Sequence, residues 1–333
     1  MRLTFLGTGT SHGVPMIGCR CAVCTSSDPR NHRRRASILV EWRETVIVVD
    51  TGPEFRLQAI DARVDRLDAV LLTHAHSDHV MGLDDVRAFN ISQSGAMPVY
   101  GSDETLAEVR HRFAYAFREG PLGGGKPQLD LREIAGPFTV GELDVVPFEL
   151  RHGPGVVTAF RFSPHDGGGP AFAYATDTNG VPEAAVEALG GLDLLVLDAL
   201  GPGPHPTHYS IAEAVAMAGR ISARRTLFTH MSHALDHEAT CASLPPGMAL
   251  AFDRQVVLLG GRVHPPQRSA SVGGLEYSDN DWRTLLDDEA GDLANAATDD
   301  PRRVIDHGGG QVEGAVGRTA ASLRSADELH RRA

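Results

Sequence analysis

The run LLTHAHSDHVMGL, residues 71–83, decides the fold of this chain. It carries His74, His76, Asp78 and His79 directly after the apolar segment Ala69–Leu72. A strand cannot bury four ionisable side chains in a row, because each would cost several kcal/mol unless it were paired or coordinated. The run therefore belongs in a loop at the end of a strand, where its side chains share a cleft.

The spacing within this run predicts two neighbouring metal ions. His74 and His76 are two residues apart and can face the same way, while Asp78 and His79 lie one turn further on. Two divalent ions about 3.5–4 Å apart can activate a water molecule and neutralise charge on the attacked group. Histidine and carboxylate ligands without thiolate are compatible with zinc, manganese and iron.

Three further candidate ligands follow other apolar, strand-like segments. They are His152 in ELRHGPG, Asp177 in YATDTNG and His230 in FTHMSH. Each lies beside Gly, Asn or Ser at the end of its segment. We therefore expect loops at strand ends to complete the metal site.

A second kind of site is indicated near the N-terminus. GCRCAVC places Cys19, Cys21 and Cys24 within six residues. In a reducing compartment such a cluster favours metal binding over disulfides. Tetrahedral zinc requires a fourth ligand, for which Cys241 and a histidine are both open.

Composition and charge limit the partners. The 333 residues include 31 basic and 43 acidic side chains, a net charge of −12, and Lys126 is the only lysine. An acidic chain repels polyphosphate at long range, so we expect no nucleic-acid partner. The cluster Arg33–Arg35 is the one candidate basic patch, with a solvated turn as the alternative.

The chain shows no signal peptide and no membrane span. Its longest apolar runs, such as TVIVV and LDLLVL, fall far short of the roughly 20 residues that cross a bilayer. The prediction is a soluble, cytoplasmic protein without membrane contact.

Short apolar segments bounded by Gly, Pro, Asp or Asn predict ten strands. Two helices are expected, at Glu104–Phe117 and at Ile211–Ala218 with Ser210 as its N-cap. This pattern favours two sheets packed face to face and covered by helices. The predicted strands are Leu3–Leu6, Ser37–Val40, Thr45–Val49, Ala69–Leu72, Val99–Tyr100, Leu143–Leu150, Val157–Phe162, Ala171–Tyr174, Leu194–Leu197 and Thr226–Phe228.

The composition changes near His264 and predicts a domain boundary. Residues 1–263 form the expected catalytic domain. Residues 264–333 read as an acidic, Ala/Gly/Arg-rich tail that is loosely ordered, with weak helical patterns at 281–293 and 320–332.

Taken in order, Asp50 in VIVVDTG, the 74–79 run and the three later ligands resemble the five motifs of the metallo-β-lactamase superfamily. The resemblance covers residues 1 to about 259. It implies an α+β fold, an αββα sandwich of two packed mixed sheets flanked by helices, with two divalent metals, zinc or manganese, at one edge. It assigns His74, His76 and His152 to one metal, Asp78, His79 and His230 to the other, Asp177 as the bridge, and Asp50 as a support that orients the loop.

The cysteine cluster within LGTGTSHGVPMIGCRCAVC narrows this resemblance. It is similar to a branch that contains cyclic-phosphate phosphodiesterases and a protein of pyrroloquinoline quinone biosynthesis. The resemblance implies that His233 completes a structural zinc site with the cysteines. It also implies that His208 helps to protonate the leaving group, although a solvent-facing His208, or His205 in its place, stays open.

The expected function is that of a dinuclear metal-dependent hydrolase. The predicted reaction is hydrolysis of a small cyclic sugar phosphate or nucleotide-like diester by metal-activated water, with Asp78 and His208 as catalytic residues. Two alternatives are a carrier protein of the same fold, as in pyrroloquinoline quinone biosynthesis, and a ribonuclease Z-like nuclease. Whether the protein forms a homodimer is left open.

Overall fold

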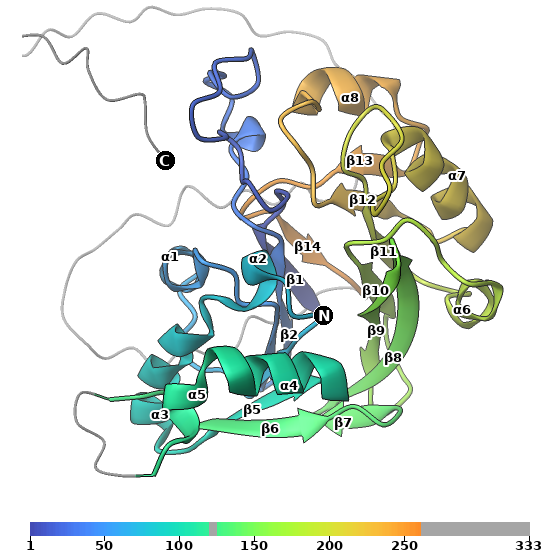
Figure 1. Ribbon diagram of the computed structural model, residues 1–333. Coiled ribbons are helices and arrows are strands. Elements are labelled where there is room, and N and C mark those ends of the chain that lie inside the picture. The colour runs from blue at the N-terminus through green and yellow to red at the C-terminus, as the bar shows by residue number, and fades with distance from the viewer. Residues whose placement is uncertain (120–124, 261–333) are drawn as a thin grey trace, which may run out of the picture. The chain divides into compact units, whose positions relative to one another are not determined.

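Two seven-stranded mixed sheets form the centre of the computed structural model, which describes residues 1–119 and 125–260 (Figure 1). In spatial order, the first sheet contains β14 (Val256–Leu258), β1 (Arg2–Gly7), β2 (Ser37–Trp42), β3 (Thr45–Val49), β4 (Ala69–Leu71), β5 (Met97–Gly101) and β6 (Leu129–Glu133). The second contains β13 (Met248–Leu250), β12 (Thr226–Thr229), β11 (Leu194–Asp198), β10 (Phe172–Ala175), β9 (Gly155–Pro164), β8 (Leu143–His152) and β7 (Phe138–Val140).

Strand direction brings the functional loops to one edge. In the first sheet β3, β4, β5 and β6 are parallel, and in the second β10, β11, β12 and β13 are parallel. β8 is antiparallel to β9, which is antiparallel to β10, so β8 and β10 run the same way. The carboxyl ends of β3, β4, β8, β10, β11 and β12 are the positions at which the candidate site residues occur.

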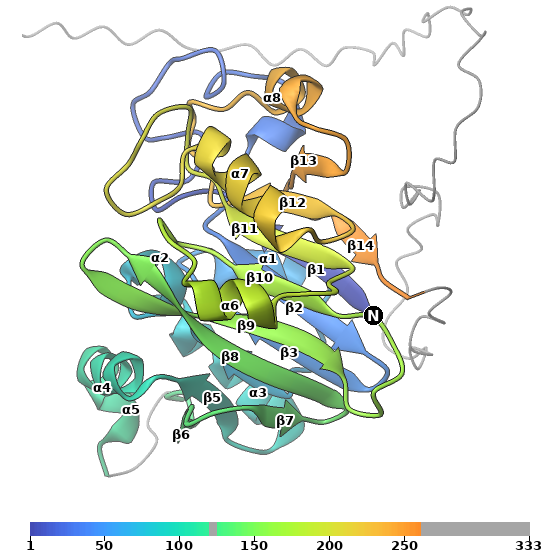
Figure 2. The same ribbon diagram turned by 90° about the vertical axis from the view of Figure 1, so that its right-hand side faces the viewer.

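The apolar side chains divide into layers as the pattern predicted. One core, which includes Phe5, Phe160 and Tyr174, fills the space between the sheets. The outer face of the first sheet is covered by α1 (Phe55–Asp61), α3 (Arg87–Gln93) and α4 (Asp103–Arg112). The outer face of the second is covered by α6 (Glu183–Ala188), α7 (Ile211–Ile221) and α8 (His237–Ser243), as Figure 2 shows. The predicted αββα sandwich is therefore confirmed.

All ten predicted strands are present, and the four unpredicted ones are the edges of the two sheets. β14, β6, β13 and β7 are each three to five residues long and only partly buried. An edge strand buries fewer side chains than a central one, so its hydrophobic pattern is weaker. The strength of the hydrophobic pattern therefore depends on how deeply a strand is buried and not on whether it pairs in a sheet.

One predicted helix is correct and the other needs a correction. Ser210 caps α7, and Glu213 completes a capping box with it. The helix predicted over residues 104–117 is instead two helices, α4 and α5 (Ala114–Phe117), separated at Phe113, whose φ and ψ are −103° and 32°. Phe113 is buried in the core with Leu106 and Val109, so the apolar spacing continues through the break and conceals it.

The predicted boundary at residue 264, the tail and its two weak helical patterns lie outside the described residues. They stay predictions.

Two glycines let the metal-binding run approach the end of β3. A Cβ on Gly52 would lie 2.3 Å from the carbonyl oxygen of Asp78, and one on Gly82 would lie 2.1 Å from that of Gly52. Hydrogen bonds from Thr51 N–H to the His79 carbonyl (2.7 Å) and from Gly82 N–H to the Thr51 carbonyl (2.8 Å) close this contact. α2 (Ser77–Val80) is thereby fixed against the loop that follows β3.

We predict that Gly52→Ala lowers the free energy of unfolding by about 3 kcal/mol, because a methyl group would meet backbone that no side-chain rotation can move. Gly219→Ala is the matched control. It lies on the exposed face of α7 with open space around it, so the change should be neutral or stabilise by about 0.5–1 kcal/mol. Urea denaturation of both variants measures the difference, and equal stability would contradict the close contact.

Candidate metal centre

Two groups of His and Asp side chains meet at the shared sheet edge. The first contains His74, His76 and His152, and the second contains Asp78, His79, Asp177 and His230. Within each group the potential ligand atoms all lie within 4.8 Å of one another. The groups adjoin, since the ring centres of His74 and His79 are 4.3 Å apart.

The second group has closely spaced donors. His79 Nε2 lies 3.2 Å from Asp78 Oδ2 and 3.3 Å from Asp177 Oδ2. His230 Nε2 lies 3.1 Å from the other oxygen of Asp177. Asp177 therefore presents one oxygen to each of two imidazoles.

Asp50 orients two histidines, one from each group. Its carboxylate accepts a hydrogen bond from His79 Nδ1 at 2.7 Å and from the Thr73 hydroxyl at 2.8 Å. The same hydroxyl lies 3.0 Å from His74 Nδ1, from which it can accept. With both Nδ1 atoms engaged, the Nε2 atoms of His74 and His79 are left as the metal-facing nitrogens.

His152 is held in the same manner by backbone. Its Nδ1 lies 3.0 Å from the carbonyl oxygen of Thr207, to which it donates. The Asn179 side chain donates to the neighbouring Pro206 carbonyl at 2.6 Å. The loop before α7 thus sets the orientation of a histidine that lies on β8.

The buried nitrogens of this centre fit a metal. The Nε2 atoms of His74, His79 and His230 are inaccessible to solvent, and none makes a well-formed hydrogen bond among the described residues. Those of His79 and His230 face carboxylate oxygens at 3.1–3.6 Å, whereas that of His74 is left without a partner. A buried polar atom left unpaired is costly, and a coordinated cation removes that cost. Imidazole and carboxylate donors in these numbers suit zinc or manganese.

Electrostatics at the centre favour a cation. Burial opposes charge on His79, but the carboxylates of Asp177, Asp50 and Asp78 outweigh it and raise the pKa of His79 well above its usual value. Burial lowers the pKa of His74, and the positive charge of its His79 neighbour lowers it further. The second group therefore attracts positive charge, and His74 in the first group is kept neutral.

Backbone strain accompanies the site. Asp50, Asp177 and His230 have φ values of 63°, 58° and 60°, in the left-handed region that non-glycine residues rarely adopt. Each follows the end of a strand. Such conformations persist only where the surroundings enforce them, and they concentrate at functional sites.

His208 lies beside the second group and is supported by a residue that the sequence analysis missed. His208 Nδ1 lies 2.9 Å from Asp198 Oδ2, and its ring stacks on that of His230 at 4.7 Å. Asp198 is fully buried and also accepts the N–H of Thr178 at 3.1 Å. The signal was present, because LLVLD ends an apolar segment with a carboxylate just as VIVVD does.

The sequence left open whether His208 faces solvent and whether His205 takes its place. His208 is buried, with 8% of its surface exposed, so it does not face solvent. His205 is exposed, and its Nδ1 accepts from the Thr207 hydroxyl at 3.1 Å.

The cysteines form a separate group with His233. The Sγ atoms of Cys19 and Cys21 lie 3.3 and 3.4 Å from His233 Nδ1, and Cys24 completes the group. The N–H of Cys24 donates to Cys21 Sγ and, with His233, lowers the pKa of that thiol to about 6. Cys241 lies elsewhere, where its sulfur accepts the N–H of Leu250 at 3.3 Å. Three thiols and one imidazole fit a tetrahedral zinc.

The three consecutive arginines do not form a basic patch. Arg33 is buried, Arg34 pairs with Asp61 at 2.7 Å, and Arg35 pairs with Glu54. The sequence left a basic patch or a solvated turn as the alternatives for this cluster. Neither describes Arg33, because both would leave its side chain exposed.

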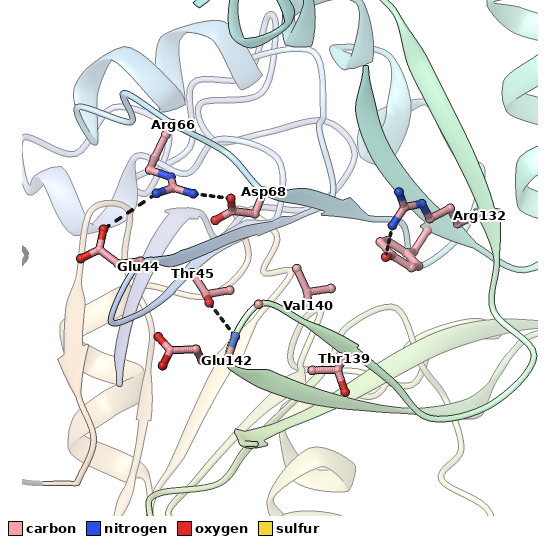
Figure 3. A pocket seen from close by; sticks show the side chains of 10 residues that line it. Glu44, Thr45, Arg66, Asp68, Arg132, Thr139, Val140 and Glu142 are labelled. Atoms are coloured by element: carbon pink, nitrogen blue, oxygen red, sulfur yellow. Dashed lines mark hydrogen bonds and ion pairs between the residues drawn. The ribbon is translucent and has the colours of Figure 1, made fainter. Parts of the chain in front are cut away.

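A cavity of about 470 Å³ lies apart from this centre (Figure 3). None of its lining residues belongs to the donor groups. Its charged side chains already have partners: Arg66 lies 2.5 Å from Asp68, Arg132 lies 2.7 Å from Asp130, and Glu142 lies 2.8 Å from Arg43. The potential metal ligands described above therefore lie outside this cavity.

An αββα sandwich with two adjoining His/Asp groups at one edge defines a hydrolase of the metallo-β-lactamase fold. The chain belongs to this superfamily, because the family described as "Beta-lactamase superfamily domain" matches residues 45–231. Among solved structures, a "New Diphosphatase from the PhnP Family" is 38% identical, with a TM-score of 0.71 over 77% of this chain and 97% of that one. Zinc-bound PqqB from Methylobacterium extorquens is 19% identical, with a TM-score of 0.65 over 78% and 100%, and shares the fold.

Curated relatives carry other names. An octanoyltransferase of Porphyromonas gingivalis is 36% identical over 84% of this chain, but the chain spans only 56% of its length. A ribonuclease Z of Anoxybacillus flavithermus is 26% identical over 76% of this chain and 96% of its own length. In the part of the chain that the structure describes, no helix is both long and apolar enough to cross a membrane.

We predict that Asp50→Asn weakens metal binding at the sheet edge by about 10–100-fold. One carboxylate oxygen accepts from His79 and the Thr73 hydroxyl and the other accepts from the Thr73 N–H, whereas the NH2 group of an amide would face one of these donors and cannot accept from it. Isothermal titration of metal-free protein with Zn²⁺ measures the affinity. Asp61→Asn, a surface carboxylate paired with Arg34, should leave it unchanged. Equal affinities in the two variants would show that Asp50 does not orient the ligands.

Proposed function

We propose that this protein is a dinuclear metal-dependent phosphodiesterase that acts on a small cyclic sugar phosphate or nucleotide-like diester. The observation that carries the proposal is the pair of adjoining donor groups with a buried histidine–carboxylate pair, His208 and Asp198, beside them. The first provides a place for two metals and the second a positioned proton donor. Together they would serve the attacking water on one side of phosphorus and the leaving oxygen on the other.

The metals would be held by the two groups as the sequence indicated. His74, His76 and His152 would hold one ion, Asp78, His79 and His230 the other, and Asp177 would bridge them. Such ions, when bound, supply charge neutralisation at phosphorus and lower the pKa of water from 15.7 to about 7. Asp50 and the Thr207 carbonyl keep the ligand nitrogens turned inward, so little reorganisation is needed during the reaction.

His208 would deliver the proton to the leaving oxygen. Its Nδ1 hydrogen bond to Asp198 leaves Nε2 as the atom that can donate. The buried carboxylate accepts the Nδ1 hydrogen bond and so fixes the ring and its tautomer. A general acid in this position contributes about 10²–10⁴-fold in rate.

The histidine–carboxylate pair bears on the choice between a diester and a diphosphate. The similar solved structure is a diphosphatase, and release of a phosphate requires little help from an acid. Release of a sugar or nucleoside alkoxide requires full protonation, because an alkoxide is a much stronger base than a phosphate. The His208–Asp198 pair therefore favours the diester, with the diphosphate as the second candidate.

Two other classes have less support. A carrier protein of this fold would not need the bridging Asp177, Asp78 and the His208–Asp198 pair together. A ribonuclease Z activity requires a basic surface for RNA. Arg33 is instead buried against backbone carbonyls, Arg34 and Arg35 are paired with carboxylates, and the chain has a net charge of −12.

We predict that the metal-loaded protein hydrolyses bis(p-nitrophenyl) phosphate, and that Asp177→Ala lowers the rate by more than about 100-fold because the bridge between the ions is lost. Metal analysis should show that this variant keeps the zinc of the cysteine group. Asp166→Ala, on the surface beside Arg43, is the control and should retain activity. Absence of turnover in fully loaded wild-type protein, on this diester and on ribosyl cyclic phosphate alike, would refute the proposed function.

We also predict that His208→Ala affects substrates according to their leaving group. The rate should fall by about 10²-fold or more for an alkyl diester, and much less for a nitrophenyl diester, whose leaving group needs no proton. Asp198→Asn should show the same selectivity, while His205→Ala should behave as wild type. Equal losses on both substrates would assign His208 a different role.

A further inference from the structure

Arg33 is a buried cation that the proposed reaction does not use. Only 1% of its surface is exposed. Burial lowers its pKa to about 10, so it is still charged at neutral pH. A buried guanidinium is costly without partners, and here the partners are uncharged: no carboxylate within the described ranges forms an ion pair with it. Its place in the fold therefore needs a reason.

The side chain of Arg33 holds the loop that carries His233. Nη1 donates to the Ser232 carbonyl at 2.7 Å, and Nη2 donates to the Leu235 carbonyl at 2.7 Å and to Asn31 Oδ1 at 3.2 Å. Ser232 directly precedes His233, and Leu235 follows it by two residues. The planar guanidinium thus spans both sides of this histidine, a geometry that a single ammonium group cannot reproduce.

The backbone of Arg33 holds the segment that leads to the cysteines. Its N–H donates to the Val14 carbonyl at 2.7 Å, and the Val14 N–H donates to the Arg33 carbonyl at 2.8 Å. Val14 packs with Val23 and Cys24 in a small apolar cluster. One residue therefore joins the thiolate side of the cysteine group to its histidine side.

His230 has anchors of its own. Met231, which follows it, donates to the Thr8 carbonyl at 2.9 Å and accepts from the Thr10 N–H at 3.1 Å. The Ser232 N–H donates to the Leu200 carbonyl at 2.9 Å. Loss of the guanidinium would accordingly loosen the carbonyls on both sides of His233, while the backbone anchors next to His230 stay in place.

We propose that Arg33 is the positioning residue for the cysteine–histidine zinc group: it closes that site by fixing His233 over the cysteines, without acting on the two metals at the sheet edge. The inference rests on the metal sites of the proposed function but not on its substrate. The proposal is tested by metal binding, so it can still be tested if the protein fails the diesterase assay.

Titration of metal-free Arg33→Lys and Arg33→Met with Co²⁺ tests the proposal. The near-ultraviolet thiolate-to-cobalt absorption reports the cysteine group, and metal analysis counts all bound ions. We expect at least about 10-fold weaker binding at the cysteine group in both variants, so that this ion is the first of the three to be lost as free metal is withdrawn. Arg34→Met, the adjacent arginine with a surface ion pair, should bind as wild type does.

A double variant tests whether Arg33 acts through His233. His233→Ala should weaken the thiolate–cobalt signal by itself, and adding Arg33→Lys should weaken it little further, because both changes remove the same ligand. Unchanged thiolate binding in Arg33→Lys would overturn the proposal. So would loss of all three ions together, or failure of both Arg33 variants to fold, since the proposal confines the effect to one loop.

Discussion

The carboxylate of Asp50 is the constraint on which the metal centre depends. It is fully buried at the end of β3, and it accepts hydrogen bonds from His79 and from Thr73, which in turn contacts His74. One side chain thereby fixes the ring orientation of a histidine in each donor group. A buried carboxylate requires such partners, so burial of Asp50 and inward orientation of the ligands support each other.

The arrangement of the sheets explains why these residues meet. Parallel strands deliver their carboxyl ends to one edge, and Asp50, Asp177 and His230 adopt a left-handed backbone where their strands end at that edge. Loop 230–233 then connects two kinds of site: His230 faces the His/Asp groups and His233 faces the cysteines. The close pair of histidines in FTHMSH is a bridge between separate sites.

Much of the fold and most of the donor groups follow from the sequence, for a physical reason. Central strands such as β3 (Thr45–Val49) bury almost every side chain and produce clear apolar runs, whereas the edge strands β6, β7, β13 and β14 do not. The donor side chains occur where those runs end, so they could be predicted with them. Asp198 carried the same signal but lay beyond the motifs used. The burial of Arg33 could not be predicted, because its partners are backbone carbonyls 199 and 202 residues away.

The central claim is that the edge of this sandwich binds two adjacent metals and the cysteine group a third. Anomalous X-ray diffraction from crystals grown with zinc tests it most directly. The account predicts three peaks per chain: two roughly 3.5–4 Å apart, between the groups of His74 and His79, and one among Cys19, Cys21, Cys24 and His233. A single peak at the sheet edge, or a thiolate-bound zinc that is not coordinated by His233, would contradict it.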